Sequence, residues 1–121
     1  MQVIPKEANG YAAARDLLSR PNPPKALFTG NCELTAGVLR AIHELNLRIP
    51  EDIALAGFDD MNWNMIVQPG ITAVAQPTYE LGRVAATLLL ERIENPSRPV
   101  REVVLKSKLV IRKSSGFLHK G

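Results

Sequence analysis

Two adjacent carboxylates, Asp59 and Asp60, follow an apolar run in the stretch "EDIALAGFDD", which is typical of a buried strand. Paired carboxylates can do acid/base chemistry, but neighbours on an extended segment point in opposite directions, which disfavours that use. Hydrogen bonding is the other possibility, because a carboxylate can accept two hydrogen bonds from one ligand. Asp60 is better suited to capping a turn, whereas Asp59 is suited either to a turn or to a ligand.

Three further side chains stand at comparable places. Asn31 follows the apolar run "ALFTG", Gln76 follows "ITAVA", and Trp63 lies shortly after the carboxylates. Ligands of open parallel sheets bind beyond the carboxyl ends of the strands, where these residues would meet. Amides and a carboxylate beside an aromatic wall suit a neutral polyhydroxylated molecule such as a sugar. The predicted binding residues are therefore Asn31, Asp59, Trp63 and Gln76.

Each of these residues also has a purely structural interpretation. Asn31 is equally suited to capping the helix that follows it. Gln76, directly before a proline, can hydrogen-bond the local backbone, and Trp63 can be half-buried packing. The sequence leaves these alternatives open.

Enzymatic and metal sites are not expected. His43 lies in the middle of a predicted helix and His119 in the tail, so neither has nearby partners in sequence for a metal. Cys32 has no histidine near it in sequence to act as a base. No glycine-rich nucleotide loop or serine-nucleophile motif is present. We expect neither catalysis nor a cofactor.

The elements that must position the binding residues alternate along the chain. Apolar residues at helical spacing predict helices in "EANGYAAARDLLSR", in the stretch after Asn31, and over residues 79–94. Leu81, Val84, Ala85, Leu88, Leu89 and Ile93 form the inward face of that last helix. Short apolar runs predict strands in "KALFTG", "EDIALAGFDD" and "ITAVA", and alternation predicts one or two more over 100–114. This order indicates an α/β protein with a parallel sheet.

Composition is typical of one ordinary globular domain: 121 residues, 45% hydrophobic, net charge +3. So small a charge does not by itself indicate nucleic-acid binding. A single cysteine excludes an internal disulfide, and nothing at the start resembles a signal peptide. No apolar run approaches the roughly 20 residues that span a bilayer. We expect a soluble cytoplasmic protein without a membrane partner. Three or four strands are few for such a sheet, so the chain is expected to be part of a longer protein.

Several stretches in order resemble one family. "LRAIHELNLRIPEDIALAGFDD", "PGITAVAQPTYELGRVAATLLLERI" and "LVIRKSS" are similar to the C-terminal part of LacI-family (lactose-repressor-like) transcriptional regulators. The likeness extends from "NGYAAARDLL" to "RKSS".

The resemblance implies a fold and a function. The fold would be periplasmic-binding-protein-like (type I), a three-layer α/β arrangement around a parallel sheet, with residues 1–121 forming a partial effector-binding domain. The chain would supply part of the C-terminal lobe, and helix 79–94 would pack in the other lobe. Segments 71–76 and 100–106 would lie near the crossovers. A small-molecule effector, usually a sugar, would bind between the lobes of a homodimeric repressor. Operator DNA would be bound by an N-terminal helix-turn-helix that this chain lacks.

The resemblance also assigns residues. Asp59 matches the family's effector-contacting aspartate, Asn31 the asparagine of an "ND" pair, and Gln76 the glutamine after the crossover; Trp63 falls in the loop beside the pocket. Two positions depart from the pattern: Cys32 stands where aspartate is common, and Pro5 about where many members have a stacking aromatic. The alternative function is a solute-binding protein of a transporter, which has the same fold.

Overall fold

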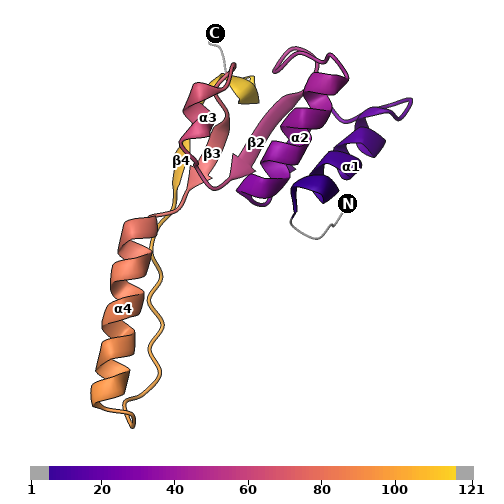
Figure 1. The fold of residues 1–121 in the computed structure, drawn as a ribbon. Coiled ribbons are helices and arrows are strands. Elements are labelled where there is room, and N and C mark those ends of the chain that lie inside the picture. The colour runs from indigo at the N-terminus through magenta and orange to yellow at the C-terminus, as the bar shows by residue number, and fades with distance from the viewer. Residues whose placement is uncertain (1–5, 117–121) are drawn as a thin grey trace. The chain divides into compact units, whose positions relative to one another are not determined.

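The computed structural model describes residues 6–116, which fall into two compact units (Figure 1). The first unit consists of the chain up to Ala75 together with the chain from Leu109 onward, and the second is Gln76–Lys108. The described elements are α1 (Glu7–Leu18), β1 (Ala26–Thr29), α2 (Cys32–Glu44), β2 (Ala54–Phe58), α3 (Trp63–Ile66), β3 (Thr72–Ala75), α4 (Thr78–Glu94), β4 (Lys108–Val110) and the 3-10 helix η1 (Lys113–Ser115).

A four-stranded sheet in the order β1-β2-β3-β4 is the centre of the first unit. β1 pairs with β2 in parallel, and β2 pairs with β3 in parallel. Parallel neighbours need crossover connections, which α2 and α3 provide. The carboxyl ends of these three strands therefore lie at the same edge of the sheet. The predicted α/β fold with a parallel sheet is confirmed.

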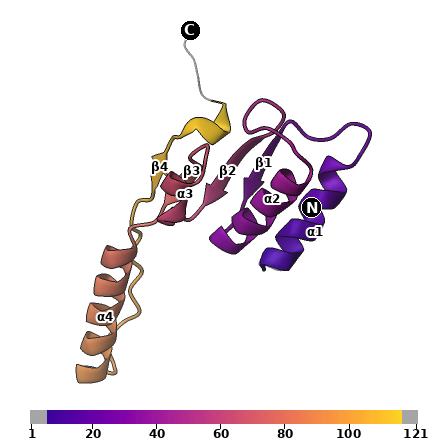
Figure 2. The same cartoon turned by 45° about the horizontal axis from the view of Figure 1, so that its top comes forward.

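The core of the first unit lies between the sheet and its helices. α1 and α2 lie on the same face of the sheet in both views (Figures 1 and 2). Ile42 of α2 packs with Leu55 of β2 and with Ile71, and all three are almost fully buried. Phe28 of the edge strand β1 is 63% exposed. α1 and α2 thus form a helical layer against one face of the sheet.

The contact between α1 and α2 depends on Gly37. A Cβ atom at this position would lie 2.1 Å from the backbone oxygen of Glu7 and 2.6 Å from the backbone nitrogen of Tyr11. Neither backbone atom can move without shifting α1, so the two helices pack this closely only with glycine at residue 37.

The second unit contains α4 and the segment that follows it. The helix predicted over 79–94 is confirmed as Thr78–Glu94, but none of its residues is buried. Leu89 and Ile93, assigned to an inward face, are 60% and 65% exposed. The predicted strand region 100–114 forms a strand only at Lys108–Val110. A strand needs a neighbouring strand for its hydrogen bonds, and the described part of the second unit offers none to residues 100–107.

None of the helices described is long and apolar enough to cross a membrane.

Candidate functional site

The carboxyl ends of β1 and β2 bring two of the predicted residues to one edge of the sheet. Thr29 and Gly57 are register partners, and Asn31 and Asp59 each stand two positions beyond that pair. Both side chains are half-buried. An amide and a carboxylate are therefore carried on neighbouring loops of the first unit, as the sequence predicts.

Asp59 has an unusual backbone conformation. Its φ is +80°, in the left-handed region that non-glycine residues rarely adopt. Its N–H donates to the carbonyl of Val74 in β3 (2.9 Å), and its carbonyl accepts from Asn64 Nδ2 (3.1 Å). A conformation of this kind costs about 1–3 kcal/mol and persists where its surroundings hold it. These two hydrogen bonds, one on each side of the residue, hold the turn.

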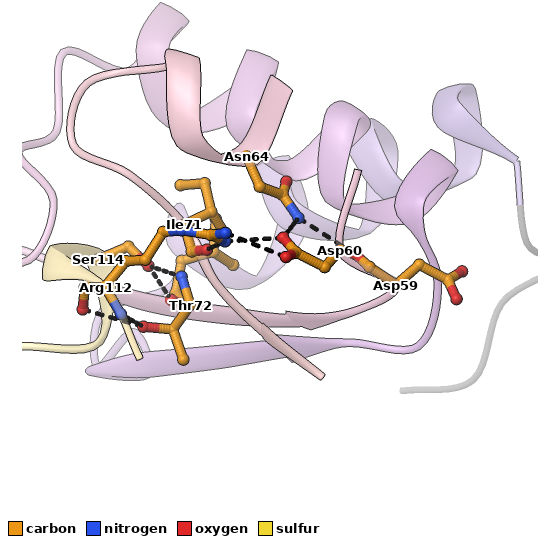
Figure 3. A network of polar contacts seen from close by, with 8 residues as sticks. Asp59, Asp60, Asn64, Ile71, Thr72, Arg112 and Ser114 are labelled. Atoms are coloured by element: carbon orange, nitrogen blue, oxygen red, sulfur yellow. Dashed lines mark hydrogen bonds and ion pairs between the residues drawn. The ribbon is translucent and has the colours of Figure 1, made fainter. Parts of the chain in front are cut away.

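Asp60 is part of a polar network that the spacing of residues did not predict (Figure 3). Arg112 Nη1 and Nη2 donate to Asp60 Oδ1 and Oδ2 at 2.7 and 3.0 Å, which is a bidentate pair. Arg112 Nη1 also donates to the carbonyl of Ile71 (2.7 Å), and Asn64 Nδ2 donates to Asp60 Oδ1 (3.1 Å). The Arg112 guanidinium, followed by the Asn64 amide, lowers the pKa of Asp60 against the raising effect of its burial.

Asn64 is the residue at which this network meets Asp59. Its side chain is almost fully buried, and its Nδ2 reaches both the carbonyl of Asp59 and the carboxylate of Asp60. Its Oδ1 is buried and has no hydrogen-bond partner within the described part of the chain.

The C-terminal segment is attached to the sheet by side chains next to Arg112. Ser114 Oγ donates to the carbonyl of Leu55 (2.6 Å) and accepts from the N–H of Thr72 (2.8 Å). Thr72 Oγ1 donates to the carbonyl of Arg112 (2.9 Å). These contacts fix the segment after β4 against β2 and β3, and so fix where the Arg112 guanidinium lies.

A match to a family profile identifies the protein family of this chain. Residues 2–115 match the periplasmic binding protein-like domain. The chain belongs to this family.

Relatives of the domain are bacterial regulators. The chain is 39% identical over 94 residues to the HTH-type transcriptional regulator KdgR of Bacillus subtilis, covering 78% of this chain and 28% of that protein. It is 38% identical over 106 residues to the ribose operon repressor of Escherichia coli K12, covering 88% and 32%. The chain thus spans about a third of the length of these relatives.

A solved structure agrees in fold. A LacI-family transcriptional regulator from Enterococcus faecalis, crystallised with bound ribose, superposes with a TM-score of 0.85 at 33% identity, over 95% of this chain and 42% of that one. The predicted resemblance to LacI-family regulators and the predicted periplasmic-binding-protein-like fold are confirmed.

Within this family domain, the predicted binding residues have different local roles. Asn31 caps α2: its Oδ1 accepts from the N–H of Leu34 (2.8 Å). The helix-cap interpretation is confirmed, and the cap uses the amide oxygen rather than the amide nitrogen. Asp59 directly follows β2, and its carboxylate points away from the Asp60–Arg112 pair (Figure 3). The two carboxylates therefore lie in different environments.

The other two predicted binding residues, Trp63 and Gln76, lie on other elements than Asn31 and Asp59. Trp63 is half-buried and is the first residue of α3, a helix that the sequence did not predict. Gln76 is exposed and is the first residue of the second unit. Roles of both side chains in binding stay predictions.

The two departures from the family pattern are Cys32 and Pro5. Cys32 is half-buried at the first position of α2, directly after the cap. Pro5 lies outside the described residues, as does His119. No group of three or more histidine, cysteine or acidic residues that would hold a metal ion occurs within residues 6–116.

A hollow of about 280 Å³ opens between α1, α2 and the edge strand β1. Its lining is mostly apolar and includes Leu17, Leu27 and Phe28, but none of the four predicted binding residues. Such a lining does not suit a polyhydroxylated ligand, so we place the candidate site at the carboxyl ends of the strands instead.

Proposed function

We propose that the chain is part of the effector-binding domain of a LacI-family transcriptional regulator and that it contributes contacts to a sugar or a related polar metabolite. Asn31, Asp59, Trp63 and Gln76 are the proposed contacts. In the intact protein, a homodimer, effector binding shifts an equilibrium between open and closed domains, and a helix-turn-helix outside this chain reads that shift on operator DNA.

One observation carries the proposal: a half-buried aspartate in a left-handed conformation directly after the carboxyl end of the inner strand β2. Backbone strain of this kind concentrates at ligand sites, because there the direction of a side chain matters more than its local stability. Arg112 binds the carboxylate of the neighbouring Asp60, whereas the Asp59 carboxylate points away from that pair, and carboxylate oxygens accept hydrogen bonds from hydroxyl groups. A relative bound to ribose supports the ligand class.

Binding of ribose to this chain is the direct test. We expect millimolar D-ribose to shift backbone amide signals of Asn31, Asp59 and Gln76 and the indole signal of Trp63 in an NMR titration. Affinity should be modest, because an effector between two lobes contacts only one side of its site in this chain. Asp59→Ala should weaken the affinity roughly 10- to 150-fold, the effect of removing hydrogen bonds to a charged acceptor worth about 1.5–3 kcal/mol.

Asp16→Ala is the matched control, because Asp16 pairs with Arg20 on the exposed surface of α1. It should leave the ribose titration unchanged. Equal affinities of the wild type and the Asp59→Ala variant would contradict the assignment of Asp59. Absence of shifts with ribose and with other pentoses and hexoses would contradict the ligand class.

A further inference from the structure

Arg112 lies far from Asp59 in the sequence but is connected to it through three polar contacts. The Arg112 guanidinium binds the Asp60 carboxylate in bidentate fashion, that carboxylate accepts from Asn64 Nδ2, and the same Nδ2 donates to the carbonyl of Asp59 (Figure 3). The chain of contacts starts on the segment that follows β4 and ends at the strained turn after β2.

Each contact in this chain limits the freedom of the next. Arg112 is itself fixed, because its Nη1 also donates to the carbonyl of Ile71 and its backbone N–H donates to Thr72 Oγ1 (2.8 Å). The bidentate geometry sets the plane of the Asp60 carboxylate. Asn64 is almost fully buried, so its amide has little room for another rotamer. Its Nδ2 can therefore hold the carbonyl of Asp59 in one place.

The network also sets the charge beside the site. The side chains of Arg112 and Asp60 are only 16% and 18% exposed, so water screens their pairing weakly. Ionised carboxylates on successive residues repel each other, and the Arg112 guanidinium offsets this repulsion by binding Asp60. Asp59 itself lies in the left-handed region, and its carboxylate is directed away from the Asp60–Arg112 pair.

We propose that Arg112, acting through Asp60 and Asn64, is a positioning residue that holds Asp59 in its left-handed conformation and so directs its carboxylate toward the ligand. The ligand part of this inference rests on the proposed function, whereas the backbone part concerns the ligand-free chain. Loss of the bidentate pair releases Asn64, and Asp59 then relaxes to a negative φ, which turns its side chain to a different direction.

The conformation of Asp59 can be measured without any ligand. A φ of +80° brings the amide and α protons of one residue close together, which gives a strong intraresidue nuclear Overhauser effect. Arg112→Lys keeps the positive charge and loses the planar fork. We expect this variant to remain folded, to show a weakened intraresidue effect at Asp59, and to bind D-ribose about tenfold more weakly than the wild type.

Arg48→Lys is the matched control, because Arg48 forms the same type of ion pair with Asp52 at the amino end of β2. It should change neither the signal of Asp59 nor the ribose titration. If Arg112→Lys lowers the melting temperature yet leaves the Asp59 signal and ribose affinity as in the wild type, the pair is only structural and the inference is wrong.

Two further outcomes are also decisive. Should Arg112→Lys not fold, Asp60→Asn replaces it, because asparagine has the shape of aspartate without its charge; an unchanged Asp59 signal there overturns the inference. Should ribose not bind the wild type, the proposed function fails, while the signal of Asp59 in the two variants still decides whether Arg112 positions it.

Discussion

Asp59 and Asp60 show how two identical side chains acquire different roles from their surroundings. Asp60 faces the Arg112 guanidinium and the Asn64 amide, so its carboxylate is satisfied within the protein. Asp59 is held through its backbone instead, and its carboxylate points elsewhere. Adjacent carboxylates on a chain therefore need not form an acid/base pair, because one can hold the turn that orients the other.

The ion pair of Asp60 predicts a specific dependence of stability on pH. Arg112 lowers the pKa of Asp60 below that of the unfolded chain, about 3.9. The pair therefore stabilises the fold at pH values above about 4, and its contribution is lost as pH falls through the lowered pKa. We expect Asp60→Asn to melt at a lower temperature than the wild type at neutral pH and to approach it as pH falls below 4.

High salt distinguishes the contribution of the Asp60–Arg112 pair from the contributions of ion pairs at the surface. Glu44, Asp52 and Glu80 also have lowered pKa values, each first through a hydrogen bond: Glu44 to Tyr11, Asp52 to Arg48 and Glu80 to Arg83. Their charges are exposed and are screened at 1 M salt, where the Debye length is about 3 Å.

A constant difference in melting temperature between wild type and Asp60→Asn from pH 7 to pH 2 would contradict the prediction.

The sequence predicted the position of Asp59 after a strand but not the residues that contact it, Asn64 among them, and the reason is physical. Asp59 follows a strand, and the change from an apolar run to carboxylates in the sequence shows where that strand ends. Arg112 is 52 residues from Asp60, and no periodicity or motif joins positions so far apart. The asparagine at 64 gave no signal either, because its burial depends on tertiary packing.

Among the elements, α2 connects the core with the candidate site. Val38 and Ile42 on one face are buried in the core, and Asn31 caps the N-terminus on the loop after β1, next to the strand that Asp59 follows. The same asparagine therefore has two possible functions, one in capping and one in binding, and substitutions can separate them.

Asn31→Asp should keep the cap and lose the amide donor. Aspartate caps helices about as well as asparagine, and its charge is favourable at a helix N-terminus. We expect its free energy of unfolding to be unchanged or slightly higher, with weaker binding of ribose. Asn31→Ala should lose both, with a cost in stability of about 0.5–2 kcal/mol. Chemical denaturation and the NMR titration measure the two effects; undiminished ribose affinity in Asn31→Asp would assign Asn31 to capping alone.

The longer elements were predictable because each repeats a pattern over many residues. α1, α2 and α4 have apolar residues at helical spacing, and the short runs between proline and glycine became β1 and β2. α3 is four residues long, which is too short for helical periodicity to appear. Residues 100–107 show the opposite error: alternation predicted a strand, but alternation alone supplies no partner for its hydrogen bonds.

At the scale of the whole molecule, the two units differ in how much apolar surface they bury. The first has a core around Ile42, Leu55 and Ile71, whereas no residue of α4 is buried. Exposed apolar residues on the described second unit include Leu89, Leu90, Ile93, Val100 and Val104. The two relatives compared above are about three times longer than this chain.

Hydrogen exchange should therefore differ between the two units. Local opening costs little where few apolar groups are buried, so we expect amides of α4 to exchange much faster than those of α2 and β2. The experiment is hydrogen exchange followed by NMR at low protein concentration. Equal protection of α4 and α2 would contradict the expectation and would mean that the apolar face is covered in solution. Repeating the measurement at increasing concentration identifies the cover: protection of α4 that grows with concentration shows that a second copy of the chain provides it.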